Sequence, residues 1–208
     1  MLLLNFLFFL WSAETIKFYG TALNEDGKKV YLEDHTVQFE EGVVQSSVTK
    51  YLHPDTKKEI AELVSTYKPH KWMPDYYYKD FRFDKHNGVD SKDDKIIVFD
   101  YRKDKKKTKD FDFKANMIGG QGFHYFIQDH LEKINKGDKV KTKFVLPGNL
   151  DYYSFVIKKS DKKKVKEDEI YMVMKLDSIL SVFISPIYMT YNLKNKRLIG
   201  YEGESNLL

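Results

Sequence analysis

Alternation of apolar and polar residues with a period of two dominates the chain from residue 16 onward. Such alternation predicts half-buried β-strands, and turn residues separate one run from the next. The first two runs, residues 16–22 and 30–39, flank a tight turn at residues 24–27, and a third run covers residues 43–52. The Asp-Gly pair in the turn supplies the positive φ that a tight hairpin needs. The sequence therefore predicts that the domain opens as an antiparallel meander.

Alternating segments predict strands through the rest of the chain as well. An extended segment that begins at residue 76 is expected to end in a turn at Asn87-Gly88. Residues 97–101 and 111–113 are expected to pair as a hairpin around a lysine-rich loop. The later predicted strands are residues 140–146, 153–157 and 170–176, followed by a closing hairpin of residues 187–193 and 197–201 that turns at Asn195-Lys196.

The period changes from two to that of a helix in two places. Residues 55–67 have apolar positions on one helical face and a capping-box spacing near their start. Residues 122–134 show a second amphipathic pattern, which Gly137 closes. Residues 180–184 are apolar without a clear period and predict a short helix or a turn. We therefore expect two or three short helices.

Together these patterns predict a mainly β (α+β) fold, with a strongly curved antiparallel sheet or half-barrel. The chain contains 15 Phe and 15 Tyr, which favour strands and supply ample material for a core. Residues 14–208 are expected to form a single β-rich domain, because no linker or internal repeat divides them. The sequence has no Cys, so neither a disulfide nor a lipid anchor on Cys is available.

Residues 1–13 differ in character from the rest. Ten of the first eleven residues are apolar, and Ser12 and Ala13 follow them. A spanning helix needs about 20 apolar residues, so this length is typical of a signal peptide. The sequence thus predicts an exported protein of the periplasm or cell envelope.

The charges are nearly balanced and mixed along the chain. There are 35 basic and 31 acidic side chains, which give a net charge of +4. Proteins that bind nucleic acid gather positive charge on one face, so we expect no nucleic-acid partner. Residues 103–109 and 162–166 are rich in Lys but include acidic neighbours, and we interpret both as solvated hairpin loops. The alternative is a patch for an anionic surface, with peripheral contact to a membrane.

Motifs that carry catalytic or metal chemistry are weak. The six His residues include no pair at the spacing of a local zinc site, and no Gly-x-Ser-x-Gly elbow occurs. The cluster of Gly119, Gly120 and Gly122 lacks the rest of a phosphate-binding motif and is typical of a tight strand-to-helix turn. We expect no enzyme activity, cofactor or metal. An enzyme would require distant His and carboxylate groups to converge in the fold.

Consecutive aromatic residues are the strongest functional signal in the sequence. In residues 76–78 and 152–153, neighbouring rings must face opposite sides of a strand. Helices could cover the second face, an apolar ligand could occupy a concave side, or a partner protein could bind there. The candidate ligand-binding residues are Tyr76, Tyr78, Phe99, Phe126, Tyr153 and Phe155.

Three parts of the sequence share turn and strand signatures with a known group of proteins: residues 18–22 with 27–31, residues 120–123 with Gly137, and residues 186–187 with 197–206. In these parts the chain resembles a bacterial family of exported β-rich proteins of unknown function, similar to periplasmic lipoprotein-carrier half-barrels. The resemblance implies a strongly curved antiparallel sheet wrapped around a few helices, with a cavity for apolar chains between them. It also implies a further strand after residue 206, so we expect the domain to be truncated at its C-terminus.

The sequence therefore predicts an exported envelope protein that binds a lipid or other hydrophobic ligand on the concave face of a half-barrel. The alternative is an envelope protein-protein interaction module without a small-molecule ligand. Such a module would dock its partner through a sheet edge or through the lysine-bearing hairpins.

Overall fold

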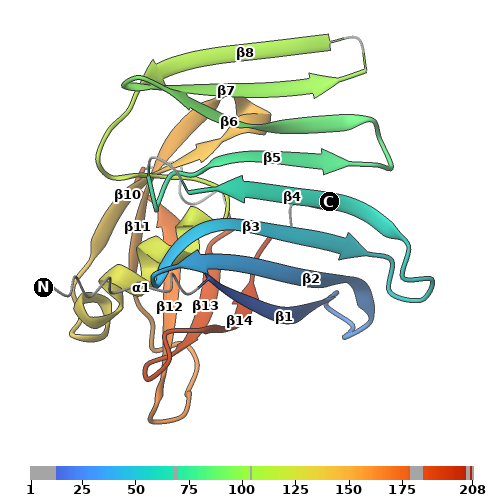
Figure 1. Ribbon diagram of the computed structural model, residues 1–208. Coiled ribbons are helices and arrows are strands. Elements are labelled where there is room, and N and C mark those ends of the chain that lie inside the picture. The colour runs from blue at the N-terminus through green and yellow to red at the C-terminus, as the bar shows by residue number, and fades with distance from the viewer. Residues whose placement is uncertain (1–12, 68–69, 104, 179–184, 205–206, 208) are drawn as a thin grey trace, which may run out of the picture.

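The computed structural model describes residues 13–67, 70–103, 105–178, 185–204 and 207. In this part of the chain the fold is mainly β, as the sequence predicts, and its strands form two sheets (Figure 1). The predicted signal peptide, except Ala13, and the predicted short helix at residues 180–184 lie outside the described residues.

The larger sheet contains eight strands, each hydrogen bonded to the strand that precedes it in the chain. Every pair in it is antiparallel, which confirms the predicted opening meander. The strands are β1 (Ala13–Leu23), β2 (Lys29–Glu40), β3 (Val43–Leu52), β4 (Glu59–Thr66), β5 (Asp75–Asp80), β6 (Lys85–Lys92), β7 (Lys95–Arg102) and β8 (Lys105–Asp112).

The smaller sheet contains six strands in the order β14-β13-β12-β11-β10-β9. Its pairs are antiparallel except for β9, which runs parallel to β10. The helix α1 (Gly122–Asn135) connects these two strands, as a parallel pair requires. The strands are β9 (Met117–Ile118), β10 (Val140–Leu146), β11 (Asp151–Lys159), β12 (Glu169–Leu176), β13 (Ile187–Asn192) and β14 (Leu198–Glu202), with a 3₁₀ turn, η1 (Pro147–Asn149), between β10 and β11.

Two expectations about the architecture are corrected. Two sheets replace the single predicted sheet, and their strands cross steeply (Figure 1). The helix predicted at residues 55–67 is wrong, because this segment forms β4. Leu63 faces the core and Val64 lies on the opposite face of that strand, so apolar residues on both faces imitated a helical period. Among the described residues α1 is therefore the single α-helix, although two or three helices were expected.

Two turns also lie elsewhere than predicted. Asn87 and Gly88 belong to β6, and the chain turns instead at residues 81–84, where Asp84 adopts a φ of 46°. The lysine-rich residues 105–109 form the edge strand β8 rather than a loop. The second lysine-rich segment, residues 162–166, does lie in the connection between β11 and β12, as predicted. The strand-to-helix turn predicted at the glycine cluster is confirmed between β9 and α1.

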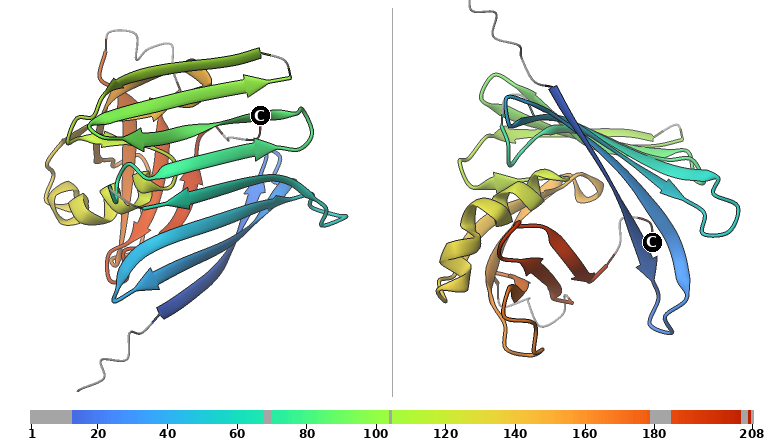
Figure 2. Two further views of the ribbon diagram at one scale, coloured as in Figure 1. Left: turned by 45° about the horizontal axis from the view of Figure 1, so that its top comes forward. Right: turned by 60° about the horizontal axis from the view of Figure 1, so that its bottom comes forward.

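The core lies between the two sheets. The helix α1 and the smaller sheet are on the same side of the larger sheet (Figure 2). On the larger sheet, Tyr76 and Tyr78 pack in one cluster with Met117 and Val145. The helix α1 buries apolar side chains against the smaller sheet, and its Tyr125 also contacts Tyr67, the residue that follows β4. No described element covers the opposite face of the larger sheet, and we call this the outer face.

Candidate functional site

The outer face of the larger sheet carries a cluster of four rings on β5, β6 and β7. Tyr77 of β5 pairs with Gly88 of β6, which in turn pairs with Phe99 of β7. Two residues along the same strands, His86 pairs with Tyr101. Because every second residue of a strand shares a face, all four rings lie on the outer face. We call Tyr77, His86, Phe99 and Tyr101 the aromatic platform.

The four rings of the aromatic platform contact one another in a closed square. The ring centroid of Tyr77 lies 5.4 Å from that of His86 and 6.1 Å from that of Phe99. Tyr101 completes the square at 5.1 Å from His86 and 5.2 Å from Phe99. These separations are within the range in which aromatic pairs attract. Tyr77 is 39% exposed and offers ring surface to a ligand, whereas Phe99 is 7% exposed and forms the floor of the cluster.

Gly88 creates a depression in the middle of this cluster. It is buried within the sheet, and a Cβ at this position would lie 2.7 Å from Cζ of Phe99 and would overlap the carbonyl oxygen of Tyr76. The missing side chain lets the Phe99 ring lean over the strand. The depression has a volume of about 390 Å³, and its lining residues are Val64, Thr66, Asp75, Tyr76, Tyr77, His86, Asp90, Phe99 and Tyr101.

Two carboxylates border one side of the depression. Asp75 accepts a hydrogen bond of 2.7 Å from the backbone N–H of Ser91. The carboxylate of Asp90, on the neighbouring strand, has no hydrogen bond or ion pair to any other described residue. Partial burial, together with the charge of Asp75, raises the pKa of the Asp90 carboxyl. Aside from the imidazole of His86, the ionisable groups that line the depression are thus acidic or phenolic, and Lys106 of β8 lies over the ring of Tyr101.

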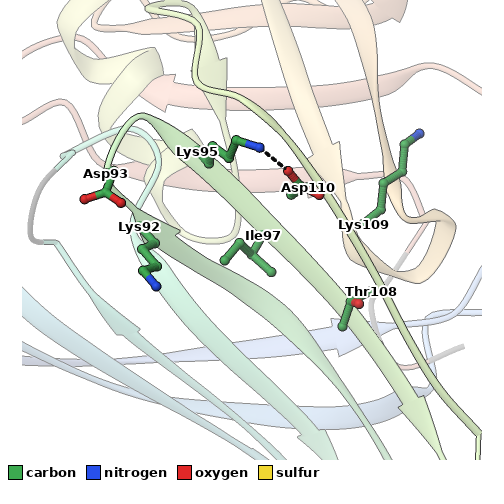
Figure 3. A pocket seen from close by; sticks show the side chains of 7 residues that line it. All are labelled: Lys92, Asp93, Lys95, Ile97, Thr108, Lys109 and Asp110. Atoms are coloured by element: carbon green, nitrogen blue, oxygen red, sulfur yellow. Dashed lines mark hydrogen bonds and ion pairs between the residues drawn. The ribbon is translucent and has the colours of Figure 1, made fainter.

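A second depression lies nearer the β8 edge of the sheet (Figure 3). Its volume is about 380 Å³, and its uncharged lining residues are Ile97 and Thr108. An ion pair of 2.6 Å between Lys95 and Asp110 borders it, with both side chains more than half exposed. The remaining charged residues of its lining are Lys92, Asp93 and Lys109, and it lacks aromatic rings. The aromatic platform is therefore the better candidate for a site that holds an apolar ligand.

On the core side of the larger sheet, a hydroxyl, an imidazole and a carboxylate converge. The hydroxyl of Thr49 lies 2.8 Å from Nδ1 of His35, and Nε2 of His35 lies 2.9 Å from Oε2 of Glu33. The ring of Phe18 stacks on His35 at 4.3 Å. This is the convergence that an enzyme would need, but Thr49 is fully buried. Its hydroxyl is therefore closed to an approaching substrate.

The same chain of hydrogen bonds continues to the start of α1. The side-chain amide of Gln121 donates to Thr49 and accepts from Ser47, whose hydroxyl lies 3.0 Å from that of Tyr67. Because Ser47 donates to Gln121, Tyr67 must donate to Ser47. By the same logic Thr49 donates to the imidazole, so the hydroxyls of Ser47, Thr49 and Tyr67 each have a partner. The arrangement fixes α1 against β3.

A second imidazole lies at the junction of α1 and the smaller sheet. Nδ1 of His124 lies 3.0 Å from the hydroxyl of Tyr191, and Nε2 accepts a hydrogen bond of 2.9 Å from the amide nitrogen of Gln128. Burial lowers the pKa of His124 to about 4, and the nearby His35 contributes to this shift. The ring is therefore neutral at about pH 7.

The structure separates the six aromatic residues that the sequence singled out. Tyr76 and Tyr78 lie in one core cluster, and Phe126 and Phe155 belong to the other. The two remaining residues are Phe99, on the outer face, and Tyr153, whose hydroxyl accepts a hydrogen bond from Asn149.

Sequence reasoning missed three members of the aromatic platform, Tyr77, His86 and Tyr101. A signal for two of them was present, because Tyr77 alternates with Tyr76 and Tyr78, and Tyr101 alternates with Phe99. The pairing of β5, β6 and β7, which brings the rings together, is visible only in the fold.

The fold and site define a mainly β protein with two sheets and an aromatic face on the larger one. The described residues contain no group of three or more His, Asp or Glu side chains that could hold a metal ion. Within the same part of the chain, no helix is long and apolar enough to cross a lipid bilayer. The chain matches no protein-family model, and comparison with curated proteins and with solved structures found no similar protein.

Proposed function

We propose that this chain is a non-enzymatic binding protein of the cell envelope, and that it holds a lipid or other hydrophobic ligand against the aromatic platform. The observation that supports the proposal is a depression bordered by four rings on a sheet face that no described element covers. Concave apolar sites with a few polar groups at their border are typical of ligand binding. The proposed export rests on the apolar leader at residues 1–13.

The outer face is a better place for the ligand than the interior that the sequence suggested. Tyr76, Tyr78 and Phe126 belong to the two core clusters between the sheets, whereas Phe99 belongs to neither. A ligand among them would have to displace the protein's own side chains, which is costly in a close-packed core. We keep the half-barrel as a proposal for the shape of the larger sheet, whose convex side would then carry the aromatic platform.

A protein partner is the second candidate, and the edge of the larger sheet favours it. Strand β1 has a neighbour on one side only, and Phe18, Tyr19 and Leu23 on it are 47%, 76% and 57% exposed. An edge strand with exposed apolar residues can pair with an extended segment of another chain.

Replacing Tyr77 and Tyr101 together with Ala should weaken binding of a neutral hydrophobic probe at least about tenfold, because each ring removed takes away part of the contact surface. The measurement is the fluorescence of N-phenylnaphthylamine, which rises when the probe leaves water. The thermal unfolding of the variant is recorded alongside, to show that it is folded.

The matched control is Tyr19→Ala, which removes an exposed ring from the same face at the far edge of the sheet. This variant should bind the probe as the wild type does. Equal affinity of the probe for the wild type and the double variant would contradict the aromatic platform as the site.

A further inference from the structure

The strand register arranges the outer face around Gly88 in three rows. The middle row is apolar, with Tyr77 and Phe99 on either side of the glycine. The row on one side carries the carboxylates of Asp75 and Asp90, and the row on the other side carries His86 and Tyr101. A ligand that lies over Gly88 would therefore meet rings beneath it and carboxylates along one side.

These carboxylates are not neutralised within the described residues. Asp110, which shares their face on β8, is paired with Lys95, whereas neither Asp75 nor Asp90 forms an ion pair with any residue that the structure describes. Two lysines near the aromatic platform are engaged with rings, and Lys92, which shares the face of Asp90 on β6, lines the second depression. Lys106 lies 5.7 Å from the ring centroid of Tyr101, and Lys79 of β5 lies 5.4 Å from the ring centroid of Phe81. Two negative charges thus border the depression in a protein whose net charge is +4.

We propose that the ligand carries an organic cation, a primary or quaternary ammonium group, on its apolar body, and that this cation binds between the carboxylates of Asp75 and Asp90 and the rings of Tyr77 and Phe99. This inference rests on the proposed function and adds the charge of the ligand to it. Aromatic faces attract ammonium groups, and a nearby carboxylate adds a direct charge interaction.

The size and polarity of the site agree with such a ligand. A depression of about 390 Å³ holds a small organic cation but not the whole of a large amphiphile, whose tail would extend along the outer face. An anionic ligand would meet repulsion from Asp75 and Asp90. A neutral ring, such as that of a sugar, would leave both carboxylates without a counter-charge. The structure therefore favours the cation over both.

The test uses three probes that share a benzyl group and differ in charge: benzyltrimethylammonium, benzyl alcohol and phenylacetate. Each is titrated into the full chain and followed by the NMR shifts of Tyr77, Gly88 and Asp90. We expect the cation to bind at least about tenfold more tightly than the alcohol, and the anion to bind most weakly.

The matching variant is Asp75→Asn combined with Asp90→Asn. Asparagine keeps an oxygen that can accept the hydrogen bond from Ser91 but removes the charge. The variant keeps the rings, so it should lose most of the preference for the cation over the alcohol, and it should bind the alcohol as the wild type does. The control is Asp34→Asn, which removes a carboxylate opposite Tyr19 on the same face, outside the depression. It should leave all three affinities unchanged.

The outcomes separate the two proposals. If benzyl alcohol binds at the aromatic platform as tightly as the cation, the inference about charge is overturned and the proposed function stands. If the double variant prefers the cation as strongly as the wild type does, Asp75 and Asp90 are not its partners, and the inference is again overturned. If none of the three probes shifts the resonances of the aromatic platform, the proposed function itself fails.

Discussion

Replacing Gly88 with Ala should lower the free energy of unfolding by at least about 3 kcal/mol. The added methyl group would overlap the carbonyl oxygen of Tyr76, a backbone atom of the paired strand that cannot move without disturbing β5. It would also press on the Phe99 ring from below. Urea unfolding of the wild type and the variant measures the difference.

Gly148→Ala is the matched control, because a Cβ at Gly148 meets no atom within 4 Å and its φ is not positive. This substitution should change the free energy of unfolding by less than about 1 kcal/mol. If Gly88→Ala were as mild as the control, the Phe99 ring would not lean over β6.

Acidification from about pH 7 to about pH 4 should remove about 3 kcal/mol of stability through His124 alone. The pKa of its imidazole is lowered from 6.5 to about 4 in the folded protein. Between these two pH values the imidazole is protonated in the unfolded chain and neutral in the folded protein, which favours unfolding. Above pH 6.5 the imidazole is neutral in both states and does not affect stability. As the pH falls from there towards about 4, His124 increasingly destabilises the folded state. Carboxylates add their own pH dependence, so the difference from a variant is the relevant quantity.

His124→Gln removes this titration and should flatten the corresponding part of the stability profile between about pH 7 and about pH 4. Urea unfolding at a series of pH values gives both profiles, and His53→Gln controls for the loss of an exposed imidazole. NMR titration of the His124 ring provides the direct check. A midpoint above about pH 6 would show that the ring is open to solvent, contrary to its contacts with Tyr191 and Gln128.

The sequence was sufficient for the strands whose two faces differ in polarity. The hairpin of β1 and β2 and the closing hairpin of β13 and β14 alternate clearly and form where they were predicted. The helix α1 was recognisable because its apolar stripe ends at Gly137. In these segments the local pattern and the final packing favour the same structure.

Prediction failed where both faces of a strand carry apolar residues. In β4, Leu63 enters the core while the adjacent Val64 lines the outer depression, and two consecutive apolar residues resemble part of a helical stripe. The turn at Asn87-Gly88 failed for a related reason. Gly88 allows Phe99 of the neighbouring strand to come close and does not form a turn. A single sequence does not reveal which residue will lie next to it.

The candidate site was the least predictable feature, because it depends on register. Tyr77, His86 and Tyr101 come from three strands, and a shift of β6 by one residue would turn His86 towards the core. The sequence indicated that aromatic residues occupy both faces of β5. It did not indicate which face stays uncovered, since that depends on the side to which α1 and the smaller sheet attach.

The order of strands in the larger sheet bears on how the molecule is made. Each of its strands hydrogen bonds to the strand before it in the chain. During synthesis, each new strand of this sheet can therefore pair with a strand that has already been made. Loops between such neighbours are short, and their closure costs little entropy. A nascent chain that emerges N-terminus first can therefore form β1 to β8 one hairpin at a time. Helix α1 and the smaller sheet, which follow in the sequence, can then pack on the larger sheet.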